Sequence, residues 1–138
     1  MKRFVLDASV ALAWFLDSPV SPYAVRVKQA LVDGARAVVP ALWHLEVANG
    51  LVVAERRRIL AAAEGTRCLQ YVEQLTSQIE TNNDLVPARQ ALSTARSFQL
   101  SAYDAVYLDT ARNEGLALAT LDPRVRAAAI RAGVEIFR

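Results

Sequence analysis

Short apolar runs alternate with longer segments along the chain. The runs cover residues 3–6, 35–39, 116–120 and 134–137, and a weaker one covers 78–81. Three of them directly follow a glycine, at Gly34, Gly115 and Gly133, and glycine is typical of the left-handed residue that ends a helix. Continuously apolar strands separated by helices indicate a parallel sheet buried between helical layers. The pattern therefore predicts an α/β protein with about five parallel strands.

Between these runs, apolar residues recur every three or four positions, as they do on one face of a helix. Such faces follow Pro22, Pro40 and Pro87, and proline is favoured in the first turn of a helix. A further helical segment covers residues 58–74, in which Gly65 predicts a break. Helices between parallel strands are expected to form right-handed crossover connections.

Composition narrows the class of protein. A length of 138 residues with 54% hydrophobic residues fits one domain, residues 1–138, with a buried core. The single cysteine, Cys68, excludes an internal disulfide and a multi-thiolate zinc site. The apolar runs are too short to cross a membrane. Asp7 ends the first run after a few residues, whereas a signal peptide has a longer uncharged apolar segment. We therefore expect a cytoplasmic protein without a membrane span.

Four of the fourteen acidic residues stand inside apolar runs rather than among polar neighbours. Asp7 ends the first strand, Glu46 lies within a helix, Asp104 lies near the start of another helix, and Asp122 follows the strand at 116–120. An isolated ionised carboxylate is strongly disfavoured in apolar surroundings. Strand ends and the helices that leave them meet at one edge of a parallel sheet, which is where such sheets bind ligands. We expect the four acids to converge in one cleft.

Converging carboxylates repel one another and need compensation. No lysine or arginine lies within these four segments, so a divalent cation is the expected compensator. Ligands that are all oxygen favour Mg²⁺, or Mn²⁺ in its place, over zinc. The alternative is local: Asp7 and Asp122 can cap the helices that follow them, and Asp104 can stabilise a helix start. Glu46 is too deep in its helix for such a role.

The segments around these acids resemble the PIN-domain family, and within it the VapC toxins of bacterial and archaeal toxin–antitoxin pairs. The matching segments are VLDASVALAW at 5–14, VPALWHLEVANGL at 39–51 and LSAYDAVYLDTARNEGLALATLD at 100–122. The resemblance follows nearly the whole chain in order. It implies a three-layer fold, with the parallel sheet flanked by helices.

The resemblance also implies a function and a site. The expected activity is Mg²⁺-dependent endoribonuclease cleavage that leaves a 5′-phosphate and a 3′-hydroxyl, in a toxin with a cognate antitoxin protein, and the expected assembly is a homodimer. The family's four acids fall on Asp7, Glu46, Asp104 and Asp122, as catalytic and metal-binding residues. Residues expected to orient ligands or waters in the cofactor site fall on Ser9, Asn49 and Thr120. The extra acid Asp109 is expected to face elsewhere on its helix.

Other residues leave alternatives open. Arginine outnumbers lysine fourteen to two, which suits phosphate contact, and the net charge is +2. Tyr103 and Tyr107 are candidates for stacking on RNA bases, or for core packing. An apolar set is a candidate antitoxin surface, or core: Trp14, Phe15, Leu16, Leu42 and Trp43. His44 is not expected to be a ligand, since it points away from Glu46 on their helix.

Three other classes of function can be weighed against these residues. A phosphoacceptor receiver needs a paired acid and a late lysine, which the sequence lacks, and a haloacid-dehalogenase-like phosphatase needs an acid where Ser9 stands. A catalytically inert PIN-like module that binds RNA or protein remains the alternative to the nuclease.

Overall fold

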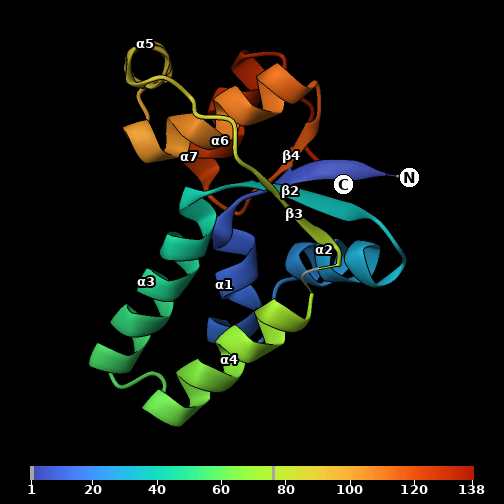
Figure 1. Ribbon diagram of the computed structural model, residues 1–138, viewed down its shortest axis with the longest axis vertical. Helices are drawn as coiled ribbons and strands as arrows, with labels where there is room; N and C mark the ends of the chain where they lie inside the picture. Colours follow the sequence, from blue (N-terminus) through green and yellow to red (C-terminus); the bar gives the residue numbers. More distant parts are fainter. Residues whose placement is uncertain (1, 76) are drawn as a thin grey trace.

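The computed structural model describes residues 2–75 and 77–138 and contains strands alternating with helices (Figure 1). The strands are β1 (Arg3–Leu6), β2 (Arg36–Pro40), β3 (Ile79–Asn82) and β4 (Ala117–Ala119). The helices are α1 (Ala8–Leu16), α2 (Pro22–Val32), α3 (Leu42–Arg56), α4 (Ala62–Gln74), α5 (Ala88–Phe98), α6 (Ala102–Glu114) and α7 (Pro123–Arg131). This confirms the α/β class.

The four strands form one parallel sheet in the order β3-β2-β1-β4. The weaker candidate strand at 78–81 forms β3, whereas the expected strand at 134–137 is a single parallel bridge between Leu118 and Ile136. It lies beside β4, so it extends the sheet at that edge without becoming a full strand. From β1 the chain continues to β2 and β3 on one side of β1, and β4 lies on the other side of β1. The strand order therefore reverses between β1 and β4. Ligands bind at such a point in parallel sheets.

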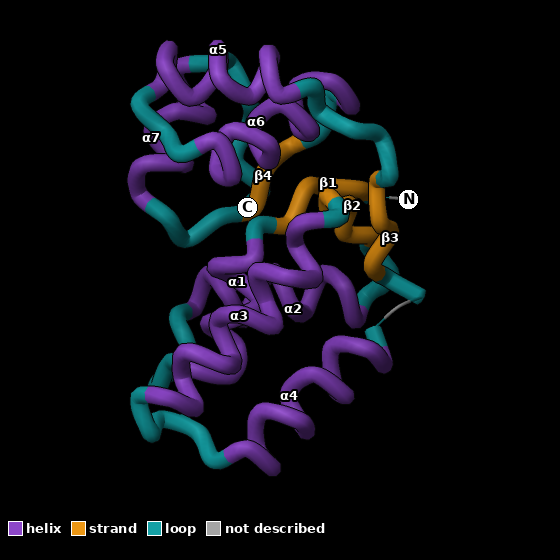
Figure 2. Tube along the Cα trace, turned by 60° about the vertical axis from the view of Figure 1, so that its left-hand side comes forward, coloured by secondary structure: helices purple, strands orange, loops and turns teal. Residues whose placement is uncertain are grey.

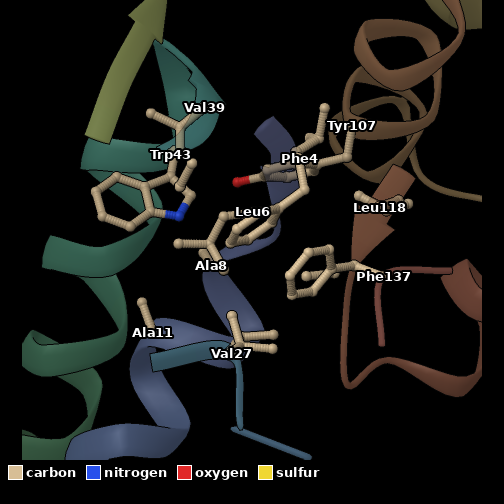
Figure 3. Close-up of a cluster of buried hydrophobic side chains, with 14 of the residues drawn as sticks. Phe4, Leu6, Ala8, Ala11, Val27, Val39, Trp43, Tyr107, Leu118 and Phe137 are labelled. Atoms are coloured by element: carbon tan, nitrogen blue, oxygen red, sulfur yellow. The ribbon is translucent and has the colours of Figure 1, made fainter. Parts of the chain in front are cut away.

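Helices cover both faces of the sheet, as a three-layer fold requires. Figures 1 and 2 show α5, α6 and α7 on one side and α1, α2, α3 and α4 on the other. The interior is continuous: the rings of Phe4 and Phe137 stack with centroids 3.9 Å apart, and Figure 3 shows both with Leu6 and Trp43 in one buried cluster. Burial of these apolar side chains is the main stabilising contribution.

The two tryptophans and Gly65 have roles that the sequence alone did not decide. Trp14 and Trp43 belong to the core, with exposures of 9% and 1%, so neither tryptophan forms a partner surface; packing between helices covers both. No break occurs at Gly65, which lies inside α4. A Cβ at Gly65 would stand 2.3 Å from Oε1 of Glu55, so the missing side chain lets α4 approach α3. In the described residues, no helix is long and apolar enough to cross a bilayer.

Candidate active site

A cavity of about 540 Å³ lies between α1, α3 and α6, beside the residues that follow β1 and β4. Its lining includes all four acids that the sequence singled out: Asp7, Glu46, Asp104 and Asp122. Asp7 directly follows β1, and Asp122 directly precedes α7 after β4. Glu46 comes from α3 and Asp104 from the first turn of α6. The fold therefore brings together four carboxylates from distant parts of the chain, as expected.

Asp7 is buried, and its environment argues against the helix-capping alternative. It occupies the N-cap position of α1, but its side chain makes no capping hydrogen bond to the described first turn. Instead the hydroxyls of Ser9 and Thr120 donate to its Oδ2, at 2.9 Å and 2.6 Å. Burial raises the pKa of Asp7, and these two hydrogen bonds partly oppose the rise. Both bonds use Oδ2, and the backbone N–H of Ser9 also lowers the pKa of Asp7.

Ser9 and Thr120 extend this contact into a network. The Thr120 hydroxyl also accepts from the backbone N–H of Asp122 at 3.1 Å, and the Ser9 hydroxyl accepts from the backbone N–H of Leu121 at 3.1 Å. Each hydroxyl thus donates to Asp7 and accepts from the loop after β4. The two strand ends that carry Asp7 and Asp122 are held together by these hydrogen bonds.

Asp122 does cap its helix, as the alternative for this residue proposed. Its Oδ1 accepts from the backbone N–H groups of Arg124 and Val125, at 2.8 Å and 3.4 Å. A capping hydrogen bond fixes the orientation of the side chain. Because both bonds use Oδ1, capping is compatible with a second role for Oδ2 at the cavity.

Glu46 is held by a residue whose role the sequence left open. The Tyr107 hydroxyl, from α6, donates a hydrogen bond to Oε1 of Glu46 on α3. Tyr107 is fully buried, so it packs in the core and does not stack on bases. Burial raises the pKa of Glu46, the Tyr107 hydrogen bond opposes this, and the charges of Asp7 and Asp104 add to it. The only sequence signal for this contact is that Tyr107 lies nearly one helical turn after Asp104.

Asp104 completes the set. Its backbone N–H donates to the Ser101 hydroxyl at 3.0 Å, which caps α6. Burial raises the pKa of the Asp104 carboxyl, the Ser101 hydroxyl opposes the rise, the charge of Asp122 adds to it and Arg124 lowers it. Asp7, Glu46 and Asp104 therefore all have raised pKa values, chiefly because of burial, and the charge of at least one neighbouring carboxylate adds to each rise.

These shifts predict how metal-free stability depends on pH. A carboxyl whose pKa is higher in the folded state stabilises the fold below its unfolded pKa, near 3.8 for Asp7, and this contribution is lost as the pH rises through the folded pKa. We expect metal-free Asp7→Asn to match the wild type near pH 4 and to melt a few degrees higher near pH 7.5. Scanning calorimetry in EDTA measures the difference.

Addition of Mg²⁺ tests the same carboxylates through the melting temperature. It is expected to raise the melting temperature of the wild type near pH 7.5 and to leave that of Asp7→Asn nearly unchanged, because only a bound cation relieves the repulsion. Asp84→Asn, which removes an exposed acid outside the cavity, is the control and is expected to behave like the wild type in both experiments. If the melting temperatures of wild type and Asp7→Asn changed with pH in the same way, this would contradict the raised pKa of Asp7.

The donor set fits a hard divalent cation. All four acids offer carboxylate oxygens, which Mg²⁺ and Mn²⁺ prefer. Among residues 2–75 and 77–138, no three His, Cys, Asp or Glu side chains are close enough to enclose an ion directly. Mg²⁺ usually retains several waters and uses only one or two carboxylates directly, and the cavity has room for such a hydrated ion.

The remaining candidates divide between the cavity and other places. Asn49 lines the cavity, as does Tyr103, which is 69% exposed. Asp109 faces away, as expected: it is buried and accepts from the Thr94 hydroxyl at 2.7 Å. His44 shares a hydrogen bond with the Thr81 hydroxyl at 2.8 Å and is outside the cavity lining.

A parallel sheet flanked by helices, with four carboxylates at its carboxyl edge, is the arrangement that the sequence resemblance implies for a PIN domain. The family model described as PIN domain matches residues 4–131. The chain therefore belongs to the PIN-domain family.

Within that family the chain belongs with the VapC ribonucleases. It is 35% identical over 121 residues to Ribonuclease VapC9 of Mycobacterium tuberculosis, covering 88% of this chain and 87% of that protein. Two solved structures share the fold. The protein PAE2754 of Pyrobaculum aerophilum matches with a TM-score of 0.70 and 21% identity, covering 92% and 84% of the two chains. A toxin-antitoxin complex from Klebsiella pneumoniae matches with a TM-score of 0.58 and 19% identity, covering 86% of each chain.

Proposed function

We propose that this protein is a Mg²⁺-dependent endoribonuclease and the toxin of a type II toxin–antitoxin pair. The observation that carries the proposal is the convergence of Asp7, Glu46, Asp104 and Asp122 on one cavity at the carboxyl edge of the sheet. Its support from relatives is the 35% identity to a protein named as a ribonuclease.

Each residue has a distinct part in this proposal. Asp7, Asp104 and Asp122 would hold the cation directly or through water, and Glu46, oriented by Tyr107, would complete the acidic cluster and either bind a second ion or orient the attacking water. A bound Mg²⁺, or Mn²⁺ in its place, polarises a phosphate oxygen and lowers the pKa of bound water. Ser9 and Thr120 keep Asp7 in place, and Asn49 offers an amide at the cavity wall.

The cavity wall also suits a protein partner. Leu12, Leu42 and Leu45 line it beside the acids, and Leu45 is 75% exposed. An exposed apolar rim indicates a site of interaction. The partner proposed here is a cognate antitoxin, as suggested by the toxin-antitoxin complex from Klebsiella pneumoniae with the same fold. A homodimer and a cytoplasmic location complete the proposal.

The test is metal-dependent cleavage. Purified protein incubated with single-stranded RNA and Mn²⁺ is expected to cut it, and EDTA is expected to reduce the rate at least about a hundredfold. A nuclease that degrades only 5′-phosphorylated RNA identifies the ends. Glu46→Gln from the same purification controls for contaminating nucleases. RNA binding without cleavage under all these conditions would favour the inert binding module instead.

A further inference from the structure

A second cavity, of about 490 Å³, lies between α2, α7 and the C-terminal segment. Its lining carries three arginines, Arg26 from α2, Arg126 from α7 and Arg138 at the end of the chain, together with one carboxylate, that of Glu135. All three arginines are exposed. The cavity is therefore rich in positive charge, in contrast to the acidic cavity described above.

Two of the arginines of this cavity stack on one aromatic ring, and neither has an acidic partner among the described residues. The guanidinium groups of Arg26 and Arg126 lie 5.7 Å and 5.4 Å from the centroid of the Tyr23 ring. Stacking on a ring orients a guanidinium but does not neutralise it. The ion pair found within residues 2–75 and 77–138 joins Arg3 to Glu80 and involves neither arginine. Two like charges beside one ring repel each other and are relieved by an anion.

This cavity shares structure with the acidic site. The bridge between Leu118 and Ile136 places the end of the chain beside the end of β4, which leads to Thr120. The Tyr23 hydroxyl donates to the backbone carbonyl of Phe137 at 2.7 Å and also lies against the Thr120 backbone. Arg126 is in the first turn of α7, which begins directly after Asp122. The basic cluster and the acids thus flank the same loop.

The described residues contain a second, similar stack of two arginines on one ring. Arg112 and Arg131 lie 6.0 Å and 5.8 Å from the centroid of the Phe98 ring. They belong to the last turns of α6 and α7, whereas the first turns of these helices face the acidic site. The two stacks have the same chemistry, and only the Tyr23 stack adjoins the site.

We propose that Arg26, Arg126 and Arg138, around Tyr23, bind the phosphates of single-stranded RNA next to the bond that is cleaved. Guanidinium groups pair with phosphate through two parallel hydrogen bonds. Arg126 is in the first turn of the helix that begins directly after Asp122, so a strand whose cleaved phosphate lies at the acids would bring a neighbouring phosphate to this cluster. The proposal rests on the proposed function, because its ligand is the proposed substrate.

The test compares two double variants that each remove two stacked arginines. In EDTA, Arg26→Gln/Arg126→Gln is expected to weaken binding of a fluorescent oligouridine RNA at least about tenfold, and Arg112→Gln/Arg131→Gln is expected to stay within about twofold of the wild type. The slope of log affinity against log salt is expected to become shallower by about 1.4 for the first variant, at roughly 0.7 per lost phosphate contact. Fluorescence anisotropy gives both quantities, and thermal melting checks that both variants fold.

Cleavage with Mn²⁺ provides a second measurement. For long RNA, the KM of Arg26→Gln/Arg126→Gln is expected to rise about tenfold with kcat nearly unchanged, because lost ground-state binding affects KM. Cleavage of a substrate too short to reach the basic cavity is expected to stay at the wild-type rate.

Each contrary result has a separate meaning. Equal RNA affinity of the two double variants, with active wild type, would overturn this proposal and leave the nuclease assignment intact. Retained RNA affinity with lost binding of a polyglutamate peptide would assign the cavity to an acidic protein segment and also overturn it. A wild-type protein that neither binds nor cleaves RNA would overturn the proposed function, and this inference with it.

Discussion

Asp7→Asn is expected to reduce metal-dependent RNA cleavage by more than about a thousandfold while leaving the fold intact. A cation at this site contributes several kcal/mol to the transition state, and each 1.36 kcal/mol corresponds to a factor of ten in rate. Asparagine keeps the size of aspartate but removes the charge that holds the ion. Initial rates on a labelled RNA, at saturating Mn²⁺, measure the loss.

The geometry around Asp7 explains why the substitution is tolerated structurally. Ser9 and Thr120 both donate to Oδ2, so the asparagine carbonyl oxygen can accept both hydrogen bonds. The amide nitrogen then replaces Oδ1. Near-wild-type cleavage by a folded Asp7→Asn protein would contradict the assignment of this cavity as the active site.

Thr120→Val is expected to lower cleavage by about 10- to 100-fold and the free energy of unfolding by about 1–3 kcal/mol. Valine has nearly the shape of threonine but lacks the hydroxyl. That hydroxyl donates to Asp7 and accepts from the Asp122 backbone, and Thr120 is fully buried. The substitution leaves a buried N–H without its acceptor and frees Asp7 to move. Urea unfolding and cleavage rates are the two measurements.

Thr120→Ser is the matched control, because it keeps the hydroxyl and removes only a methyl group. We expect it to retain most of the activity and to lose about 1 kcal/mol of stability. The opposite order, with valine active and serine inactive, would show that shape at this position matters more than the hydrogen bonds. Asp7 would then be held in place by packing.

Much of the fold follows from local pattern. Apolar runs mark β1, β2 and β4, the last two directly after a glycine, and prolines mark the starts of α2 and α7. These signals depend on near neighbours in the sequence, which is why they are legible without the tertiary structure. The four acids were found in the same way, since each stands in an apolar run where a charge is costly.

Other features depended on contacts that local pattern does not encode. Asp7 and Asp122 occupy equivalent N-cap positions, yet only Asp122 caps its helix. The short C-terminal run at 134–137 makes one bridge rather than a strand. Gly65 permits helix packing instead of ending a helix. In each case a neighbour from elsewhere in the chain decides between two local options.

The sequence by itself determined the class of fold, the order of its elements and which carboxylates are out of place among apolar neighbours. Only the tertiary structure decided how those carboxylates are held. Tyr107 reaches Glu46 across 61 positions, and Thr120 reaches Asp7 across 113. Periodicity records whether a side chain faces the interior, whereas the partner it meets there depends on how helices and strands pack in three dimensions.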